Sequence, residues 1–400
     1  MPESQPAASP IAVLVAPNTF KGWIPAALAA PAIAGGVREA WPSAVCREMP
    51  LADGGDGFLD ALAALPGSRV DQHQVHGPLG QPVSARLVRL GRGRVAAVEL
   101  AGACGLGLVA QPRPETSLRA STRAVGELIL EAIHQEARQV VVGLGGSAST
   151  DGGAGLVQAL GFRLTGGDGE ELAPGGVGLL ELAGIDPGRA APGLRELDLV
   201  AACDVDSPLL GPYGAARVFG PQKGAGPAEV EQLERGLANW AEVLRRELGP
   251  VPSPDRPGMG AAGGTAYGLA ALCGARLESG VSLVADLVGL DGALDRSQLV
   301  ITGEGRFDRT SLSGKVTGEV LRRAAARGLP CIVLSAGWEE AAARRARELG
   351  GVLVLTTSAP GRLPRSRAEA LGQLRAASRQ ACLELGPLGR GGPGQSVGGR

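Results

Sequence analysis

The chain has 400 residues, 44% of them hydrophobic and 20% charged, enough to bury a substantial core in domains of about 150 residues each. Its 39 Lys and Arg nearly balance its 40 Asp and Glu, and the net charge of −1 argues against nucleic acid or a membrane surface as the main partner. No apolar run approaches the roughly 18 residues of a membrane span, and the first residues lack the basic and apolar segments of a secretory signal. We therefore expect a cytoplasmic protein.

Strands and helices alternate at the beginning of the chain. The apolar run 11–16 predicts a strand, and Pro25 suits the first turn of a helix over 25–40. A second strand at 45–49 leads into an acidic, Gly-rich loop and a helix that runs to about residue 65. This order is typical of a parallel sheet.

The middle of the chain has a different pattern. Short segments broken by glycine and proline between 70 and 93 predict antiparallel strands. An extended run, a helix and a buried strand at 140–144 follow. A Gly/Pro-rich connection at 165–193 separates them from another buried strand at 197–202 and a long helix at about 228–248. We interpret this part as a separate, mixed domain.

The last third of the chain alternates most clearly. Strands are predicted at 298–302, 331–335 and 352–356, and helices at 315–327, 339–349 and 367–385, with a loop at 303–314. The fold class is therefore α/β with two domains.

The two predicted domains are interleaved along the chain. A Rossmann-like, doubly wound parallel sheet comes from both chain ends, 1–75 plus 285–385, and a mixed α/β domain is inserted at 76–284. The Gly-rich tail at 386–400 is expected to be disordered. Because ligands bind at the carboxyl ends of parallel strands, we expect the site in a cleft between the domains.

Lysine is rare in this sequence. Only three of the 39 basic residues are lysines, and Lys21, Lys223 and Lys315 each adjoin a glycine. An ammonium is a compact point charge, whereas a guanidinium is a wide planar fork. Glycine lets the backbone approach an anion closely. The pattern predicts that at least one of these lysines binds a phosphate or a carboxylate.

The sequence gives little support for a zinc site or for a hydrolase with a catalytic histidine. The six cysteines are scattered without a CxxC pair, and the three histidines form no cluster. The remaining candidates for chemistry are acidic and small polar residues in loops, which favours phosphoryl transfer, where positioning and charge neutralisation dominate.

Several of these loops follow predicted strands. The segment 144–155 places glycines and hydroxyls between a strand and a helix, where backbone N–H groups can face phosphate. Asp204 and Asp206 follow a buried strand and could hold Mg²⁺ or take a proton from an alcohol. Glu304 and Arg306 suit a metal–phosphate site or a substrate carboxylate.

Long sequence blocks resemble the signature segments of bacterial class I glycerate kinases. In chain order they are APNTFKG, LADGGDGF, GGSASTDGGAG, ACDVDSPLLGPYGA followed by VFGPQKGA, GAAGG and VITGEGRFD, from about residue 11 to 385. The resemblance implies phosphorylation of D-glycerate with ATP and Mg²⁺, typically at the 2-hydroxyl. It also implies two α/β domains, one Rossmann-like and one inserted.

Roles follow from the resemblance together with the chemistry of the loops. Lys21 and Arg306 would bind the glycerate carboxylate or the transferred phosphate. Either Asp53 or Asp204 would orient and deprotonate the hydroxyl, and Asp206 or Glu304 would help to hold Mg²⁺. Further candidates are Asn18, Thr19, Asp56, Lys223 and Lys315 for the substrate, and Gly145, Gly146, Ser147, Ser149, Asp151, Gly152, Gly263 and Gly264 for the nucleotide or its phosphates.

Two alternatives remain open at this point. The chain could phosphorylate another small hydroxy acid, or it could be a catalytically inactive homologue that binds a metabolite. The family usually has Asp-Ser where this sequence has Asn18-Thr19, so one negative charge is absent. We expect a monomer or a homodimer.

Overall fold

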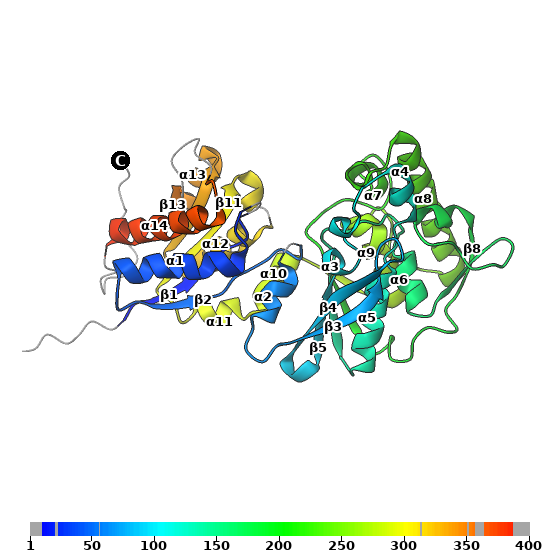
Figure 1. The fold of residues 1–400 in the computed structure, drawn as a ribbon, viewed down its shortest axis with the longest axis horizontal. Coiled ribbons are helices and arrows are strands. Elements are labelled where there is room, and N and C mark those ends of the chain that lie inside the picture. Colours follow the sequence, from blue (N-terminus) through cyan, green and yellow to red (C-terminus); the bar gives the residue numbers. More distant parts are fainter. Residues whose placement is uncertain are drawn as a thin grey trace, which may run out of the picture. The chain divides into compact units, whose positions relative to one another are not determined.

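The structure is a computed structural model that describes residues 10–20, 23–55, 57–312, 314–349, 352–356 and 364–386. The described residues form two compact units (Figure 1). Unit 1 comes from the two chain ends, up to Asp53 and from Val284 onward, and unit 2 is the continuous segment Gly54–Leu283. The prediction of an α/β fold with parallel sheets is confirmed.

Unit 1 is built on a parallel five-stranded sheet with the order β13-β12-β11-β1-β2. Its strands are β1 (Ala12–Val15), β2 (Val45–Glu48), β11 (Leu299–Phe307), β12 (Cys331–Trp338) and β13 (Val352–Thr356). β1 pairs with β2 on one side and with β11 on the other. The winding therefore reverses between β1 and β11, and such a switch point is where open parallel sheets bind ligands.

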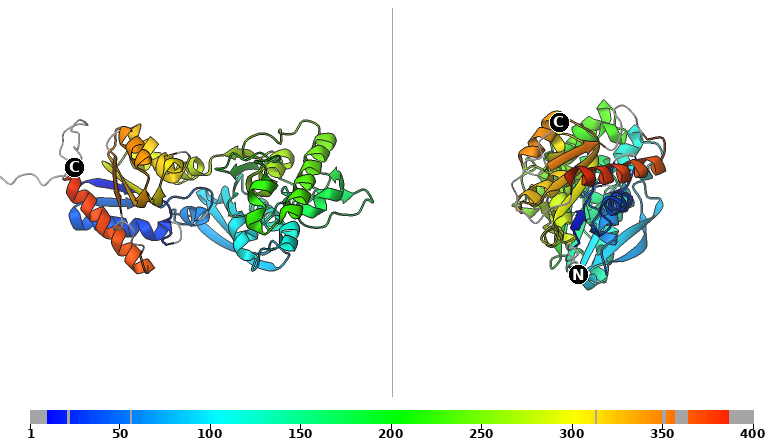
Figure 2. Two further views of the ribbon diagram at one scale, coloured as in Figure 1. Left: turned by 90° about the horizontal axis from the view of Figure 1, so that it is seen from above. Right: turned by 90° about the vertical axis from the view of Figure 1, so that its left-hand side faces the viewer.

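Helices cover both faces of this sheet. α1 (Ala26–Ala40) and α14 (Arg367–Leu385) pack together on one face, and α12 (Val316–Ala325) and α13 (Glu340–Glu348) lie on the other (Figure 2, left). The burial of β1, β11 and β12 on both faces agrees with their apolar sequences.

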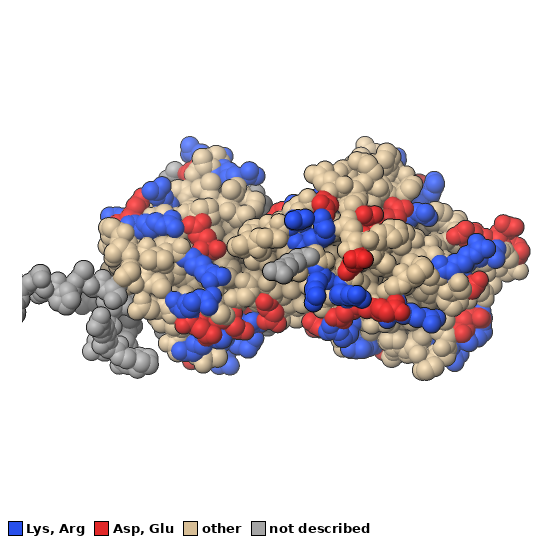
Figure 3. Space-filling model, turned by 90° about the horizontal axis from the view of Figure 1, so that it is seen from below, with Lys and Arg blue, Asp and Glu red and all other residues tan. Residues whose placement is uncertain are grey.

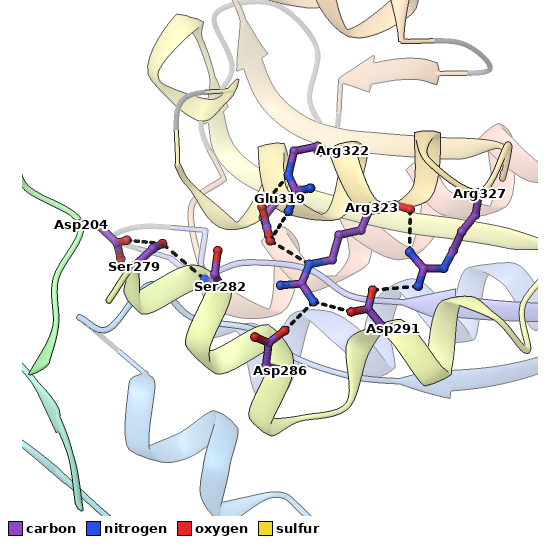
Figure 4. Close-up of polar contacts among 9 residues, drawn as sticks. All are labelled: Asp204, Ser279, Ser282, Asp286, Asp291, Glu319, Arg322, Arg323 and Arg327. Carbon is purple, nitrogen blue, oxygen red and sulfur yellow. Dashed lines mark hydrogen bonds and ion pairs between the residues drawn. The ribbon is translucent and has the colours of Figure 1, made fainter. Parts of the chain in front are cut away.

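Ion pairs fasten α12 to its neighbours in unit 1. Arg323, which is 8% exposed, donates to Glu319 on its own helix at 2.7 Å. It also donates to Asp286 on the last turn of α10 (Gly280–Leu287) at 2.7 Å and to Asp291 on α11 (Leu290–Leu294) at 2.9 Å (Figure 4). The buried guanidinium thus fixes three helices to one another.

Unit 2 contains a mixed six-stranded sheet with the order β10-β9-β6-β5-β4-β3. The strands are β3 (Arg69–His76), β4 (Pro82–Leu90), β5 (Val95–Glu99), β6 (Gln139–Gly143), β9 (Asp198–Ala202) and β10 (Arg276–Glu278). β5, β6, β9 and β10 are parallel, whereas β3 and β4 pair antiparallel at the other end of the sheet. The carboxyl ends of the four parallel strands therefore meet at one edge of the sheet.

The remaining elements of unit 2 surround this sheet. They are α2 (Phe58–Ala63), α3 (Leu100–Cys104), α4 (Pro114–Arg119), α5 (Arg123–His134), α6 (Ala154–Ala159), α7 (Ala215–Phe219), α8 (Pro227–Leu248), α9 (Ala261–Cys273), and the hairpin strands β7 (Arg163–Gly166) and β8 (Leu182–Asp186). The core of the unit includes the fully buried side chains Trp240 and Tyr267.

Some elements differ from the sequence-based expectation. The antiparallel strands β7 and β8 lie mostly within the segment 165–193, where only a connection was predicted. β11 continues to Phe307, so the prediction of a loop from residue 303 was wrong, and Glu304 and Arg306 lie on a strand. β3 pairs with β4 along its whole length, so unit 2 begins before residue 76. The predicted disordered tail falls almost entirely outside the described residues.

The surface has no large region of a single charge on the face shown in Figure 3, where basic and acidic side chains are interspersed. This pattern agrees with the near balance of charges in the sequence. None of the described helices combines the length and the apolar character that crossing a bilayer requires.

Candidate functional site

The switch point of unit 1 brings together candidates from distant parts of the chain. The N–H of Asn18, just after β1, donates to the Gly303 carbonyl on β11 at 2.8 Å. Asn18 is 5% exposed, and its side-chain oxygen accepts the N–H of Thr19 at 2.7 Å. Asn18 therefore lies beside Gly303, the residue that precedes Glu304 on β11.

Glu304 presents a buried carboxylate at this edge. It is 6% exposed, and its Oε1 has no hydrogen-bond partner among the described residues. Burial raises the pKa of the Glu304 carboxyl, and the Thr317 and Ser311 hydroxyls and the Lys315 ammonium offset that effect only in part. A buried acceptor without a partner is costly unless a ligand or water satisfies it.

The segment after β11 presents charged groups close to Glu304. Lys315 precedes α12 and donates to the Thr310 hydroxyl at 2.5 Å. The Thr310 hydroxyl in turn donates to Asp308 at 2.6 Å and, with Lys315, lowers the pKa of that carboxyl. Arg306 is 72% exposed in its side chain and lies 3.3 Å from Glu339, so its guanidinium is accessible to a ligand.

The acidic loop after β2 begins at the same edge of unit 1. The N–H of Leu51 donates to the Pro17 carbonyl at 3.0 Å, which places this segment beside the one that carries Asn18. Asp53 is the last residue of unit 1 and is half-buried. Two predicted site residues, Lys21 and Asp56, lie outside the described residues.

In unit 2 the Gly-rich loop between β6 and α6 is packed tightly against its neighbours. A Cβ on Gly145 would lie 2.5 Å from the Gly55 Cα, and a Cβ on Gly152 would lie 2.7 Å from the Trp240 ring. Gly146 and Gly152 have φ of 71° and 62°, which favours glycine at both positions. The packing and the backbone conformation of the loop therefore favour glycine at Gly145, Gly146 and Gly152.

Asp151 anchors the same loop from inside. It is fully buried, and its carboxylate accepts the N–H and the hydroxyl of Thr122, both at 2.8 Å, and the N–H groups of Gly153 and Gly155 at 3.2 Å. Burial raises the pKa of Asp151 despite these bonds. The oxygens of Asp151 thus already have protein donors. Its contact with a nucleotide phosphate stays a prediction.

The kinked start of α9 seals this loop. Ala262, Gly263 and Gly264 all have positive φ, and a Cβ on Gly263 would lie 2.1 Å from the Ser149 carbonyl. The Gly263 carbonyl accepts the N–H of Gly152 at 3.0 Å. Gly263 thus packs on the predicted phosphate loop.

Lys223 also joins the loop. This residue is 3% exposed and donates to the Ser147 hydroxyl at 2.9 Å and to the Ser149 carbonyl at 2.5 Å. Burial lowers the pKa of its ammonium to about 8, and the carboxylate of Asp151 offsets that effect in part. The Ser149 and Thr150 hydroxyls, both buried, have no partner within the described part of the chain. Three predicted residues, Ser147, Ser149 and Lys223, thus form one polar cluster.

Asp204 and Asp206 follow β9 at the carboxyl edge of the parallel strands of unit 2. Both are exposed and accessible to a ligand. Asp204 lies against Gly280, where an added Cβ would be only 2.7 Å from its Oδ2. The Ser279 hydroxyl donates to Asp204 at 2.9 Å. Ser279 was not among the predicted site residues, although a serine directly before the apolar segment of a helix is a recognisable cap.

The donors for a metal are few. Among the described residues no three His, Cys, Asp or Glu side chains are grouped to hold a metal ion. Mg²⁺ in phosphoryl-transfer sites needs only one or two carboxylates, because phosphate oxygens and water complete its octahedron. The Oε1 of Glu304, which no group in the described part of the chain satisfies, and the exposed carboxylate of Asp206 both fit that limited role.

The comparisons with known proteins agree with these motifs. Residues 13–385 match the glycerate kinase family. The chain belongs to this family. The resemblance seen in the sequence blocks is thereby confirmed, and the protein is an enzyme of the glycerate kinase family.

Relatives of this glycerate kinase family member align over most of its length. Glycerate kinase of Bacillus subtilis (strain 168) is 40% identical over 320 residues, which are 80% of this chain and 83% of that protein. Glycerate 2-kinase of Escherichia coli (strain K12) is 42% identical over 304 residues, 76% of this chain and 79% of that protein. The crystal structure of a Salmonella typhimurium LT2 protein assigned as glycerate kinase 2 superposes with a TM-score of 0.82 at 37% identity, covering 94% of this chain and 98% of that one.

Proposed function

We propose that this enzyme transfers the γ-phosphoryl group of ATP to glycerate with Mg²⁺, and that the 2-hydroxyl is the acceptor. The proposal rests mainly on the buried Oε1 of Glu304, which has no hydrogen-bond partner among the described residues and lies at the switch point of the unit 1 sheet. The membership of the chain in the glycerate kinase family supports it. The similarity to a protein named glycerate 2-kinase favours 2-phosphoglycerate as the product.

Asp204 is the general base in this proposal. Asn18 carries no carboxylate, and its side-chain oxygen already accepts the N–H of Thr19. Asp204 is exposed, and its Oδ2 lies against Gly280, which has no side chain. Asp204 takes the hydroxyl proton as the glycerate oxygen bonds to the γ-phosphorus and the bond from that phosphorus to the oxygen of ADP breaks. Asp53 is the alternative base.

The other groups bind and neutralise charge. Arg306, and Lys21 outside the described residues, bind the glycerate carboxylate or the transferred phosphate, and Lys315 adds a cation beside Glu304. Glu304 or Asp206 contributes a carboxylate to Mg²⁺, which neutralises the phosphate oxygens when it is bound. The loop from Gly145 to Ser149, with Lys223 behind it, supports the phosphates of the nucleotide.

Steady-state kinetics of Asp204→Asn and Glu304→Gln test these assignments. We expect kcat with glycerate, ATP and Mg²⁺ to fall about 100-fold or more for Asp204→Asn, and the Mg²⁺ requirement to rise for Glu304→Gln. Asp255→Asn, a change of the same kind at an exposed position of unit 2, is the control and should keep wild-type rates. Wild-type kcat in Asp204→Asn would transfer the role of base to Asp53.

The product and the substrate class need a separate assay. Enolase converts 2-phosphoglycerate directly, whereas 3-phosphoglycerate also requires phosphoglycerate mutase. Signal with enolase alone supports the 2-hydroxyl, and signal only after addition of the mutase supports the 3-hydroxyl. Faster turnover of another hydroxy acid would replace glycerate as the substrate, and nucleotide binding without turnover of any acid would identify an inactive homologue.

A further inference from the structure

Lys223 is a buried ammonium whose bonded partners are neutral. The residue is 3% exposed, and its ammonium donates to the Ser147 hydroxyl at 2.9 Å and to the Ser149 carbonyl at 2.5 Å. It forms no ion pair with a carboxylate among the residues that the structure describes. A charge taken out of water is costly unless an opposite charge compensates for it, so this site favours the approach of an anion.

Two titratable groups act on this ammonium from neighbouring elements. Burial lowers the pKa of Lys223 to about 8, although the Asp151 carboxylate before α6 and the Cys104 thiol at the end of α3 both act to raise it. The Asp151 carboxylate already accepts four bonds, two from Thr122 and two from backbone N–H groups. Burial raises the pKa of Cys104, which keeps it a neutral thiol. The amine is therefore about half-protonated at pH 8, and a further negative charge nearby would favour the protonated form.

The loop that Lys223 contacts contains other groups suited to a phosphate. The Ser149 and Thr150 hydroxyls, both buried, have no hydrogen-bond partner within the described part of the chain. Hydroxyl groups can donate to phosphate oxygens, and a Gly-rich loop can present backbone N–H groups to the same oxygens. The ammonium and these two hydroxyls therefore belong to one loop whose chemistry favours a phosphate group over other anions of similar size.

We propose that Lys223 supplies positive charge to the nucleotide phosphates in unit 2, and that binding of the nucleotide is coupled to the uptake of a proton by its amine. The inference rests on the proposed function, in which this loop supports those phosphates. The proton comes from solvent and is taken up at Nζ, which changes from –NH2 to –NH3⁺, and no covalent bond to the nucleotide forms. By linkage, the nucleotide binds more weakly at alkaline pH, where the amine is neutral before binding.

NMR of the full-length enzyme labelled with ¹³C-lysine tests the coupling directly, because the chain contains only three lysines. Without nucleotide, we expect one Cε signal to titrate near pH 8, well below the value of about 10.4 for an exposed lysine. ATP and Mg²⁺, added without glycerate so that ATP is not consumed, should raise this midpoint by about one pH unit, which corresponds to about tenfold weaker ATP binding at alkaline pH. Loss of the signal in Lys223→Arg assigns it. If that variant does not fold, Lys21→Arg and Lys315→Arg assign it by elimination.

Isothermal titration calorimetry with ATP and Mg²⁺ counts the protons independently, when it is carried out in two buffers of different ionisation enthalpy. At pH 8 the wild type should take up about 0.4 proton per ATP more than Lys223→Met, and at pH 6.5, where the amine is already charged, this difference should nearly vanish. Arg195→Met is the matched control, because it removes an exposed positive charge from the same unit. This variant should take up as many protons as the wild type at both pH values.

The outcomes distinguish this inference from the proposed function. If the wild type binds ATP and phosphorylates glycerate, but no lysine signal titrates near pH 8 or that signal does not move with ATP, the coupling is overturned and the proposed function stands. Equal proton uptake by the wild type and Lys223→Met at pH 8 leads to the same conclusion. If the wild type neither binds ATP nor phosphorylates glycerate, the proposed function fails and the role of Lys223 fails with it.

Discussion

Lys223 is an ammonium held where water does not reach it. It donates to the Ser147 hydroxyl and to the Ser149 carbonyl inside unit 2, and its pKa is lowered to about 8. A buried amine of this kind stabilises the fold more as the neutral form than as the cation. Its charge at neutral pH is kept at a cost in stability, which is typical of a functional group.

The stability of the protein should show this titration. The fold lowers the pKa of Lys223 from 10.5 to about 8, so between these pH values the unfolded chain binds more protons and the contribution of Lys223 to the free energy of unfolding rises with pH. Relative to Lys223→Met, the wild type should gain about 2 kcal/mol between pH 7.5 and 9.5. Urea unfolding of both proteins in the presence of a reductant measures this difference. The two proteins contain the same thiols, so the titration of the thiols cancels in the comparison. A difference that is constant across this range would contradict the prediction.

The sequence singled out Lys223 but could not predict its environment. The scarcity of lysine and the adjoining glycine pointed to a site, whereas the bonds to Ser147 and Ser149 join residues more than 70 positions apart. The glycines of the 145–153 loop were expected to face phosphate. Gly152 instead donates its N–H to Gly263 and lies against Trp240, contacts that only the folded chain creates.

Among the elements, α1 and α14 pack closely against each other in unit 1. A Cβ on Gly36 would lie 2.1 Å from both the Arg375 carbonyl and the Ser378 hydroxyl, and that hydroxyl donates to the Ile33 carbonyl at 2.9 Å. Gly35, its neighbour in α1, faces only the flexible end of Arg375, with its nearest atom at 3.5 Å. A methyl group added at Gly36 would therefore clash with α14, whereas one added at Gly35 would fit.

Alanine at these two positions should change stability in opposite directions. Gly36→Ala forces α1 and α14 apart and should destabilise the protein by about 2 kcal/mol. Gly35→Ala has space for a methyl group and gains helix propensity, so it should stabilise by about 0.5 kcal/mol. Thermal and urea unfolding of both variants measure the difference. Equal effects would show that propensity, not the helix contact, decides at both sites.

Helices with a strong sequence periodicity were predictable, whereas strands whose length depends on pairing with another strand were not. The helices at 227–248 and 367–385 begin with proline or a serine cap and were expected almost to the residue. β10 has three residues and depends on pairing with β9. β11 extends past Glu304 because it pairs with β12 as far as Phe307, and no local signal in a Gly-rich sequence indicates that pairing.

At the scale of the whole molecule, each unit has a core of its own. The large cluster around Trp240 and Tyr267 draws only on unit 2, and the cluster around α1, α14 and the sheet of unit 1 draws only on the two chain ends. The alternation of strands and helices predicted two domains from the sequence. The exact division at Asp53 depends on which strands pair and was not visible in composition.

Unit 2 should fold by itself. A fragment 54–283 keeps its complete sheet and core, and Trp240 is the single tryptophan within it. We expect cooperative urea unfolding in which Trp240, buried and bonded to the Gly152 carbonyl at 3.1 Å, shifts its fluorescence to the red. The fragment should lack kinase activity, since Glu304 and Arg306 are absent. A gradual, non-cooperative change would show that unit 2 depends on unit 1.

The pairing of β1 with β11 and of α1 with α14 also has a consequence for synthesis on the ribosome. When β1 and α1 emerge, their partners are more than 280 residues from being made, which at about 5–20 residues per second is a delay of tens of seconds. Unit 2 is completed during that delay and can fold first, while the apolar face of α1 waits for α14. The apolar face of α1 therefore stays without its native partner for most of translation.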